Sequence, residues 1–281
     1  MELAMDTQRV NDVTSDRLRQ FIDGHHEADY AVVDVRQPEE YRLGHIPGAE
    51  LFPLGELETF ADRLRAMADK TVVFYCRSGG RSARASAWAK ATLGLPRVVN
   101  LLGGFSGYEG ATLADLPRLE HFDVAGDPDE LFRRALDMEK GTYRFYQLLV
   151  DEFSGSPVSR SIGELAKAER VHGKAVHAML ARRAPETEQD FDSLFDALPG
   201  DLIEGGESYD AVLARARELG TQGPTSLLEL ALEIELRAYD LYKILAARID
   251  SAEAAAALTD LAQQEKQHAD SVLRAIGMMA S

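Results

Sequence analysis

The chain of 281 residues has very little cysteine: Cys76 is its single thiol. One cysteine excludes an intramolecular disulfide and a metal site built from four cysteines. It also excludes a second thiol in the same chain that could resolve an oxidised or sulfur-loaded Cys76. Any role for Cys76 must therefore be that of a lone thiol.

Positive charge and long apolar runs are also scarce. The chain carries 31 basic and 47 acidic residues, a net charge of −16, which argues against nonspecific binding to nucleic acid or to an anionic membrane surface. No stretch approaches the ~18 apolar residues of a membrane span. Residues 1–16 lack the basic start and apolar core of a signal peptide. We therefore expect a cytoplasmic protein that binds neither nucleic acid nor membrane.

The residues that are present have an ordinary globular composition, with 45% apolar and 28% charged side chains. The length is typical of two domains. In residues 1–122 short β-branched runs alternate with helical patterns, which predicts an α/β domain with a mostly parallel sheet. Residues 123–128 are expected to form a linker. The expected elements are strands at 30–35, 71–75 and 98–101, a short strand near Leu51, and helices at 15–22, 57–68 and 83–93.

Residues 129–281 are helical in pattern and contain an internal repeat. The octet LAQQEKQH at 261–268 repeats LAKAERVH at 165–172, and the same offset of 96 residues carries 135–139 onto 231–235. The repeat predicts a duplicated helical hairpin that forms a four-helix bundle. The expected helices are 129–153, 159–182, 225–248 and 252–277, with a crossover at 183–224 that contains a short helix at 210–219.

Each copy supplies a lone glutamate and, 30 residues later, a Glu-x-x-His. Residues three apart lie on one helical face, so each Glu-x-x-His can converge on one point. Four carboxylates in a bundle core would repel one another and lose hydration, and two divalent cations would cancel their charge. This is the pattern of di-iron and di-manganese carboxylate bundles. The candidate ligands are Glu139, Glu169, His172, Glu235, Glu265 and His268.

Cys76 follows a predicted buried strand and precedes a predicted helix. At such a position, backbone N–H groups and the helix dipole favour an anion. Two glycines let the loop curl so that its N–H groups point inward, and two arginines add positive charge. These features predict a lowered pKa for the Cys76 thiol and a nucleophilic role. The candidate catalytic residues are Cys76, Arg77, Ser78, Gly79, Gly80 and Arg81.

Several motifs resemble those of single-domain rhodaneses over residues 12–120. They are DVR at 34–36, EY at 40–41, GHIPGA at 44–49, CRSGGRS at 76–82 and LGG at 102–104. The resemblance implies that Cys76 accepts a sulfane sulfur from a small donor, thiosulfate or a persulfide, and passes it to a thiol or cyanide acceptor. Four residues separate Cys76 from Arg81, as in the sulfurtransferases of this fold, whereas the related phosphatases have one more. Asp34, Arg36 and His45 are expected to be structural.

The helical part resembles the rubrerythrin-type, ferritin-like di-iron proteins over residues 128–278. The resemblance implies two iron ions per chain, or manganese, with Glu169 and Glu265 bridging them. Glu139 and Glu235 would be terminal ligands, and the two histidines would each bind one metal. It also implies an oxidoreductase that reduces peroxide or O2, and a homodimer. Tyr146 and Tyr242, two turns beyond the lone glutamates, are either plain core or hydrogen-bond donors to a carboxylate.

Two features depart from that family. One cysteine cannot build the four-cysteine iron site that supplies electrons there, so an external electron donor is expected. One turn after Glu235 stands Ala238, where the family has a further glutamate. The main hypothesis is therefore a sulfurtransferase fused to a di-iron bundle. The alternatives are a persulfide carrier or sensor whose bundle is a binding or regulatory module, and a bundle that oxidises sulfur delivered by Cys76.

Overall fold

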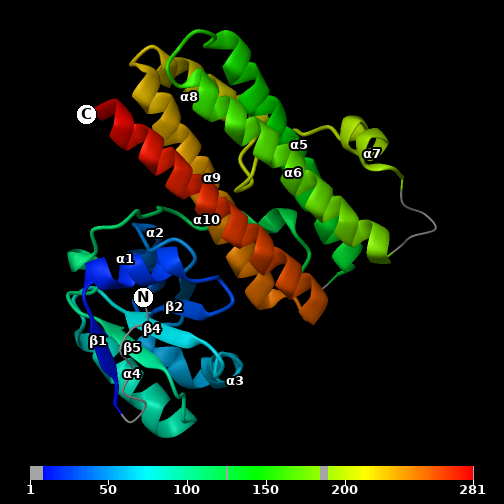
Figure 1. Cartoon of the computed structure of the whole chain (residues 1–281). Helices are drawn as coiled ribbons and strands as arrows, with labels where there is room; N and C mark the ends of the chain where they lie inside the picture. Colours follow the sequence, from blue (N-terminus) through cyan, green and yellow to red (C-terminus); the bar gives the residue numbers. More distant parts are fainter. Residues whose placement is uncertain (1–8, 125, 184–188, 281) are drawn as a thin grey trace. The chain divides into compact units, whose positions relative to one another are not determined.

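The computed structural model describes residues 9–124, 126–183 and 189–280, which form two compact units, Met1–Leu116 and Pro117–Ser281 (Figure 1). The division lies before the expected linker at 123–128. The short 3-10 helix η3, Leu119–His121, precedes Phe122, and the Phe122 ring packs into the core of the helical unit. Residues 117–122 therefore belong with the helices instead of closing the first domain.

The first unit contains a five-stranded parallel sheet with the strand order β1-β5-β4-β2-β3. This confirms the α/β prediction. The edge strand β1 was not predicted, because its three residues carry no apolar run and are held by pairing with β5. The strands are β1 Asn11–Val13, β2 Tyr30–Asp34, β3 Glu50–Leu51, β4 Thr71–Tyr75 and β5 Val98–Leu101.

Successive residues of a strand point to opposite sides of the sheet, so the sheet has two apolar faces, and helices cover both. Val72, Phe74 and Cys76 belong to one apolar core, and Val73 and Tyr75 to the other. Cys76 therefore leaves the carboxyl end of a central strand, the edge where parallel sheets bind ligands. The helices are α1 Ser15–Gly24, α2 Pro38–Arg42, α3 Ala61–Arg65 and α4 Gly80–Leu93, with 3-10 helices η1 Leu54–Phe60 and η2 Phe105–Gly107.

The helix predicted at 57–68 is instead η1 followed by α3. The apolar spacing nevertheless places Leu57, Phe60, Leu64 and Met67 in one core. A three-residue step is common to 3-10 and α-helices. The spacing thus predicted the buried side chains, whereas the predicted single helix is two short helices that end at Arg65.

The second unit is the predicted four-helix bundle, in which α5 packs against α6 and α9 against α10 (Figure 1). The observed ends lie close to the predicted ones. In the crossover, α8 contacts both α5 and α9, and α7 was not predicted. None of the helices in the described ranges has the length and apolar content of a membrane span. The helices are α5 Pro128–Glu152, α6 Ser159–Arg183, α7 Phe191–Ala197, α8 Tyr209–Gly220, α9 Pro224–Arg248 and α10 Ala252–Ala280.

A polar layer crosses the middle of this bundle. On α5, one apolar cluster ends at Met138 and the other begins at Phe145, and Glu139 lies between them. On α9 the two clusters follow in the reverse order, and Glu235 lies between Ile234 of the second cluster and Ala238 of the first. The apolar layers exclude water from the acids between them, so those acids must find other partners.

Candidate functional sites

The Cys76 loop holds its sulfur against the start of α4. Cys76 is 1% exposed, and the Gly79 N–H group donates to its Sγ at 3.2 Å. This orientation requires a φ of +97° at Gly79, in the left-handed region that glycine tolerates. Arg77 and Ser78, the next two residues of the predicted catalytic loop, are exposed. The loop therefore directs backbone N–H groups at the thiol, as its glycines predicted.

Ser82 is a functional candidate that the sequence did not single out. Its buried Oγ lies 3.5 Å from Cys76 Sγ and 2.7 Å from Asn100 Oδ1, and Asn100 Nδ2 donates to Asp12 at 2.7 Å. Burial raises the pKa of the Cys76 thiol, but hydrogen bonds from the Ser82 hydroxyl and from the N–H groups of Ser82, Ser78 and Gly79 lower it overall. The motif at 76–82 includes Ser82, but the sequence alone gave this serine no role.

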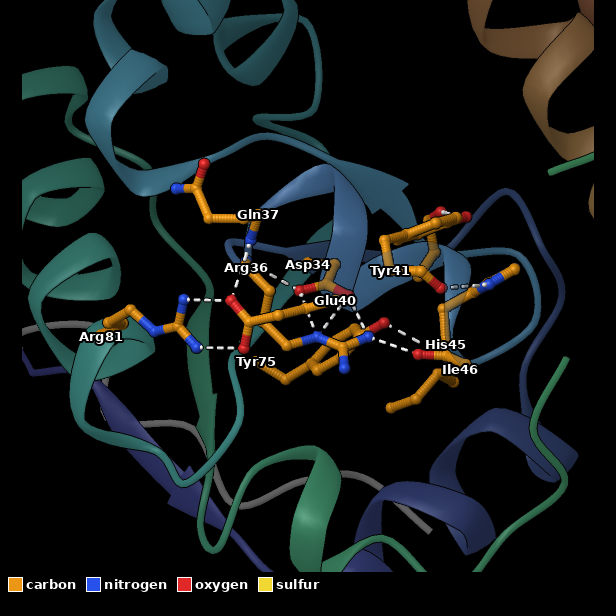
Figure 2. Close-up of polar contacts among 11 residues, drawn as sticks. Asp34, Arg36, Gln37, Glu40, Tyr41, His45, Ile46, Tyr75 and Arg81 are labelled. Carbon is orange, nitrogen blue, oxygen red and sulfur yellow. Dashed lines mark hydrogen bonds and ion pairs between the residues drawn. The ribbon is translucent and has the colours of Figure 1, made fainter. Parts of the chain in front are cut away.

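Arg81 ties the loop to α2 through a two-point ion pair with Glu40 (Figure 2). Both N–O distances are 2.7 Å. The hydrogen bond from Arg81 lowers the pKa of Glu40 to about 2. Because its charge is neutralised by Glu40, Arg81 contributes to the thiolate less than its sequence position suggested, and hydrogen bonds do more.

Asp34 and Arg36 form a buried ion pair at 2.7 Å beside the loop (Figure 2). Arg36 also donates to the Gly44 carbonyl at 2.6 Å and lies 4.2 Å from the centroid of the Phe105 ring. His45 is fully buried, with its ring stacked on Tyr41 at 3.8 Å. These contacts leave the three motif residues bracing the turn at 44–49 and away from the thiol.

A second glycine-containing loop, at 103–107, packs against the backbone of the Cys76 loop. The Phe105 N–H group donates to the Cys76 carbonyl at 2.7 Å, and the Ser106 N–H group to the Arg77 carbonyl at 2.9 Å. A Cβ on Gly104 would lie 2.3 Å from the Cys76 carbonyl oxygen. The glycine at 104 is therefore needed for the two loops to touch.

In the bundle, the six candidate ligands converge on one polar layer. The four glutamate side chains are fully buried, His172 is 2% exposed and His268 is 20% exposed. His172 Nδ1 lies 2.8 Å from a Glu265 oxygen, and His268 Nδ1 lies 3.4 Å from a Glu235 oxygen. The two imidazoles stack with centroids 4.7 Å apart. The pseudo-symmetric repeat thus brings all six side chains together.

Glu204 is a seventh member, supplied by the crossover. It is 1% exposed, and one of its oxygens belongs to a group with Glu139, His172 and Glu265 whose donor atoms all lie within 4.8 Å of one another. The family's further glutamate is absent at Ala238, and the crossover brings a carboxylate to this cluster instead. The repeat could not have revealed Glu204, because it lies in the unrepeated segment between the two hairpins.

The two tyrosines left ambiguous by the sequence are hydrogen-bond donors. Tyr146 on α5 donates to a Glu235 oxygen, and Tyr242 on α9 donates to a Glu139 oxygen, each at 2.6 Å. Each hydroxyl therefore crosses from one hairpin to the lone glutamate of the other. Both hydroxyls are fully buried, and burial raises the pKa of each tyrosine. They hold the two glutamates in place as neutral donors.

The donor atoms of this layer fit a metal site. Among the described residues, nine carboxylate oxygens and imidazole nitrogens of the cluster are buried without a hydrogen-bond partner. Burial, with the neighbouring carboxylates, raises the pKa of Glu169 and Glu204. Burial also raises the pKa of Glu265, but the two imidazoles outweigh it and lower that pKa to about 2. Five acids and two imidazoles leave an excess of negative charge that bound cations would neutralise.

Comparisons with known proteins identify both units. The model of the rhodanese-like domain matches residues 16–111, and that of rubrerythrin matches residues 226–281, which contain α10 and all but the first two residues of α9. YqhL of Bacillus subtilis is 38% identical over 79 residues, which are 28% of this chain and 60% of that protein. The probable adenylyltransferase/sulfurtransferase MoeZ of Mycobacterium tuberculosis is 36% identical over 92 residues, 33% of this chain and 23% of that protein.

Among solved structures, a rhodanese-like domain protein from Staphylococcus aureus is 29% identical, with a TM-score of 0.31, and the match covers 36% of this chain and 95% of that one. The chain covers less than two thirds of YqhL and of MoeZ. The rhodanese-like match lies within the first unit, whereas the rubrerythrin match lies in the second. The protein therefore joins a rhodanese-like domain to a rubrerythrin-type domain in one chain.

Proposed function

We propose that the first domain transfers sulfane sulfur through Cys76 and that the second holds two iron ions and reduces peroxide or O2. The observation that carries the first half is the thiol with a lowered pKa beneath inward N–H groups. The observation that carries the second is the buried layer of unpartnered carboxylate and imidazole atoms. Each half is testable without the other.

In the sulfur-transfer step, the Cys76 thiolate attacks the outer sulfur of thiosulfate. The S–S bond of thiosulfate breaks, sulfite leaves, and a persulfide remains on Cys76. An acceptor thiolate then attacks the outer sulfur of that persulfide and releases the Cys76 thiolate. The N–H group of Gly79 and the hydroxyl of Ser82 stabilise the anionic sulfur before and after each transfer. A persulfide would serve equally well as the donor.

In the bundle, two groups of donors would each hold one ion. Glu139, His172 and Glu204 group with Glu265, and Glu235 and His268 also group with Glu265. Glu169 groups with both His172 and His268, so Glu169 and Glu265 would each serve both ions. Bound iron would supply the electrons that convert peroxide and two protons to water. The tyrosine hydroxyls orient the lone glutamates, and the apolar layers exclude bulk water. With one cysteine in the chain, the replacement electrons must come from an external donor. A homodimer is the assembly we propose.

The first half is tested by thiosulfate:cyanide transfer and by intact mass. The wild-type chain should gain the mass of one sulfur atom after exposure to thiosulfate and release it to cyanide or a thiol. Cys76→Ser should do neither, and Ser78→Ala, which removes an exposed hydroxyl and keeps the backbone N–H, should do both. Folded wild-type protein without transfer or adduct would refute the sulfurtransferase.

The second half is tested by elemental analysis of the full chain. We expect two iron atoms per chain in the wild type and loss of both in Glu265→Ala, because Glu265 belongs to both donor groups. Glu253→Ala removes an exposed acid from the same helix and should keep both. Wild-type protein that holds well under two metal atoms per chain, or that holds them without consuming peroxide or O2 in the presence of a donor, would refute this half.

A further inference from the structure

The polar layer of the bundle approaches the surface along one seam. A cavity of about 380 Å³ lies between α6 and α10. Leu165, Ala168 and Val272 form an apolar wall, and Ser161 and Ser271 add hydroxyl groups. Arg160 and Glu164 also line it and bring opposite charges, so the wall carries no net charge. Its chemistry suits a small uncharged molecule that forms hydrogen bonds.

One residue that lines this cavity, His268, is a candidate metal ligand. His268 is 20% exposed, whereas His172 is 2% exposed and the glutamates of the layer are essentially buried. The Nδ1 atom of His268 is buried and lies 3.4 Å from Glu235 and 3.7 Å from Glu265. Because Nδ1 faces the acids, the opposite edge of the ring faces the cavity.

The opposite side of the layer, between α5 and α9, is closed by the crossover. The Glu204 N–H group donates to Thr142 Oγ1 on α5 at 3.0 Å, and its side chain fills the layer. A Cβ on Gly141 would lie 1.9 Å from the Leu202 carbonyl oxygen, and one on Gly205 would lie 2.6 Å from Arg237 Cβ on α9. The loop therefore fits against both helices without room for a solute.

The repeat itself explains why the two sides of the α6/α10 seam differ. Ala168, which lines the cavity near His268, corresponds under the 96-residue offset to Gln264. A glutamine is much larger than an alanine, and Gln264 donates to the Asp260 carbonyl at 3.2 Å along its own helix. The second copy thus carries a longer side chain at the position that corresponds to Ala168 of the cavity wall.

We propose that the α6/α10 cavity is the entrance to the bundle site, and that a small neutral oxidant such as hydrogen peroxide enters beside His268 and not beside His172. The entrance serves the iron chemistry proposed above and in that respect rests on it. The second donor group, with Glu204, is the sealed half. The two halves of a duplicated site therefore have different tasks, one open to substrate and one enclosed.

The entrance is tested first in the metal-free full chain, so that iron is not required. In a Cys76→Ser background, His268→Cys and His172→Cys each carry a single thiol, and iodoacetamide should alkylate the former at least tenfold faster. Adding Ala168→Phe should slow the reaction at position 268 at least tenfold. Ala178→Phe, the same change at an exposed alanine of α6, should leave it unchanged. Equal rates at 268 and 172, or no effect of Ala168→Phe, would overturn the proposal.

A second measurement uses the iron-loaded chain with native histidines. Nitric oxide, a small neutral ligand of ferrous iron, should bind to the wild type and to Ala178→Phe at the same rate, and at least tenfold more slowly to Ala168→Phe at equal iron content. Unchanged nitric oxide binding in Ala168→Phe would also overturn the entrance. If the cysteine variants follow the alkylation pattern but the wild-type chain holds no iron, the proposed oxidoreductase is refuted and the entrance stands, so the two failures are distinguishable.

Discussion

Glu204 offers the sharpest test of the bundle chemistry. Two divalent cations would neutralise four carboxylates, and Glu204 adds a fifth. Five carboxylates with two ferrous ions carry a net charge of −1, and with two ferric ions +1. Without Glu204 the same states carry 0 and +2. The extra carboxylate should therefore stabilise the oxidised state, and Glu204→Gln should raise the reduction potential.

The size of that shift follows from the geometry of the cluster. The donor atoms that include Glu204 lie within 4.8 Å of one another, so its charge acts at about 5 Å. At an effective dielectric constant of about 20, one unit charge at that distance is worth about 3 kcal/mol. For a one-electron step this corresponds to about 140 mV. We expect an increase on the order of 100 mV, since the neutral amide keeps a dipole in the same position.

The assay is an anaerobic redox titration of the iron-loaded chain, followed by visible absorption and electron paramagnetic resonance. The matched control is Glu207→Gln, which removes a charge from the same turn, where Glu207 is partly exposed and lies 3.4 Å from Arg215. Solvent and that arginine should hold its effect below about 20 mV. If Glu204→Gln retained its iron and titrated at the potential of Glu207→Gln, the argument that Glu204 faces the metal would be refuted.

The remaining predictions concern the catalytic loop and the stability of each domain. Ser82→Ala should raise the pKa of the catalytic thiol, because it removes a hydrogen bond to the sulfur, and should slow alkylation at neutral pH by about tenfold at most. Ser86→Ala, which removes a buried hydroxyl without a hydrogen-bond partner, should leave the alkylation rate unchanged. Gly104→Ala should destabilise the first domain by about 3 kcal/mol in urea unfolding, because the added methyl group overlaps the Cys76 loop and φ is +55°. Gly94→Ala, at a similar φ but with open space around it, should destabilise the domain by only about 1 kcal/mol. Equal losses of stability would contradict the contact between the loops. In the metal-free chain, the acids raise the pKa of His268 from 6.5 to about 9 against the effect of burial. That stabilisation is complete below pH 6.5 and is lost as the pH rises through 9, so calorimetry should show a falling Tm of the bundle over this range, and a constant Tm would contradict it.

The sequence was sufficient wherever a local pattern controls the outcome. Continuous apolar runs rich in β-branched residues located β2, β4 and β5, which are buried on both faces. The apolar repeat located the four long helices to within a few residues, because spacing along a helix decides which face is buried. The same logic failed for β1 and α7, which are short and are held by neighbours that the local sequence does not reveal.

The sequence predicted those site residues that belong to a recognisable motif or to the internal repeat. A constant offset joined six ligands from four helices, and those side chains do meet in one layer. The roles of Glu204 and Ser82 were not predicted: Glu204 has no counterpart in the repeat, and nothing in the motif at 76–82 shows that the Ser82 side chain faces Cys76. Each becomes visible only through its contacts, Glu204 with the other acids and Ser82 with Cys76 and Asn100.

By itself, the sequence determined that this protein combines a lone thiol on a glycine-rich loop with a doubled set of buried acids and imidazoles. Both follow from residue types at fixed spacing, and spacing is set by the geometry of single helices and strands. Only the tertiary structure decided which groups tune the thiol, which carboxylate the crossover adds, and that His268 borders a cavity while His172 is enclosed. Those outcomes depend on how loops fill the seams between elements, and that packing is a property of many distant residues acting together.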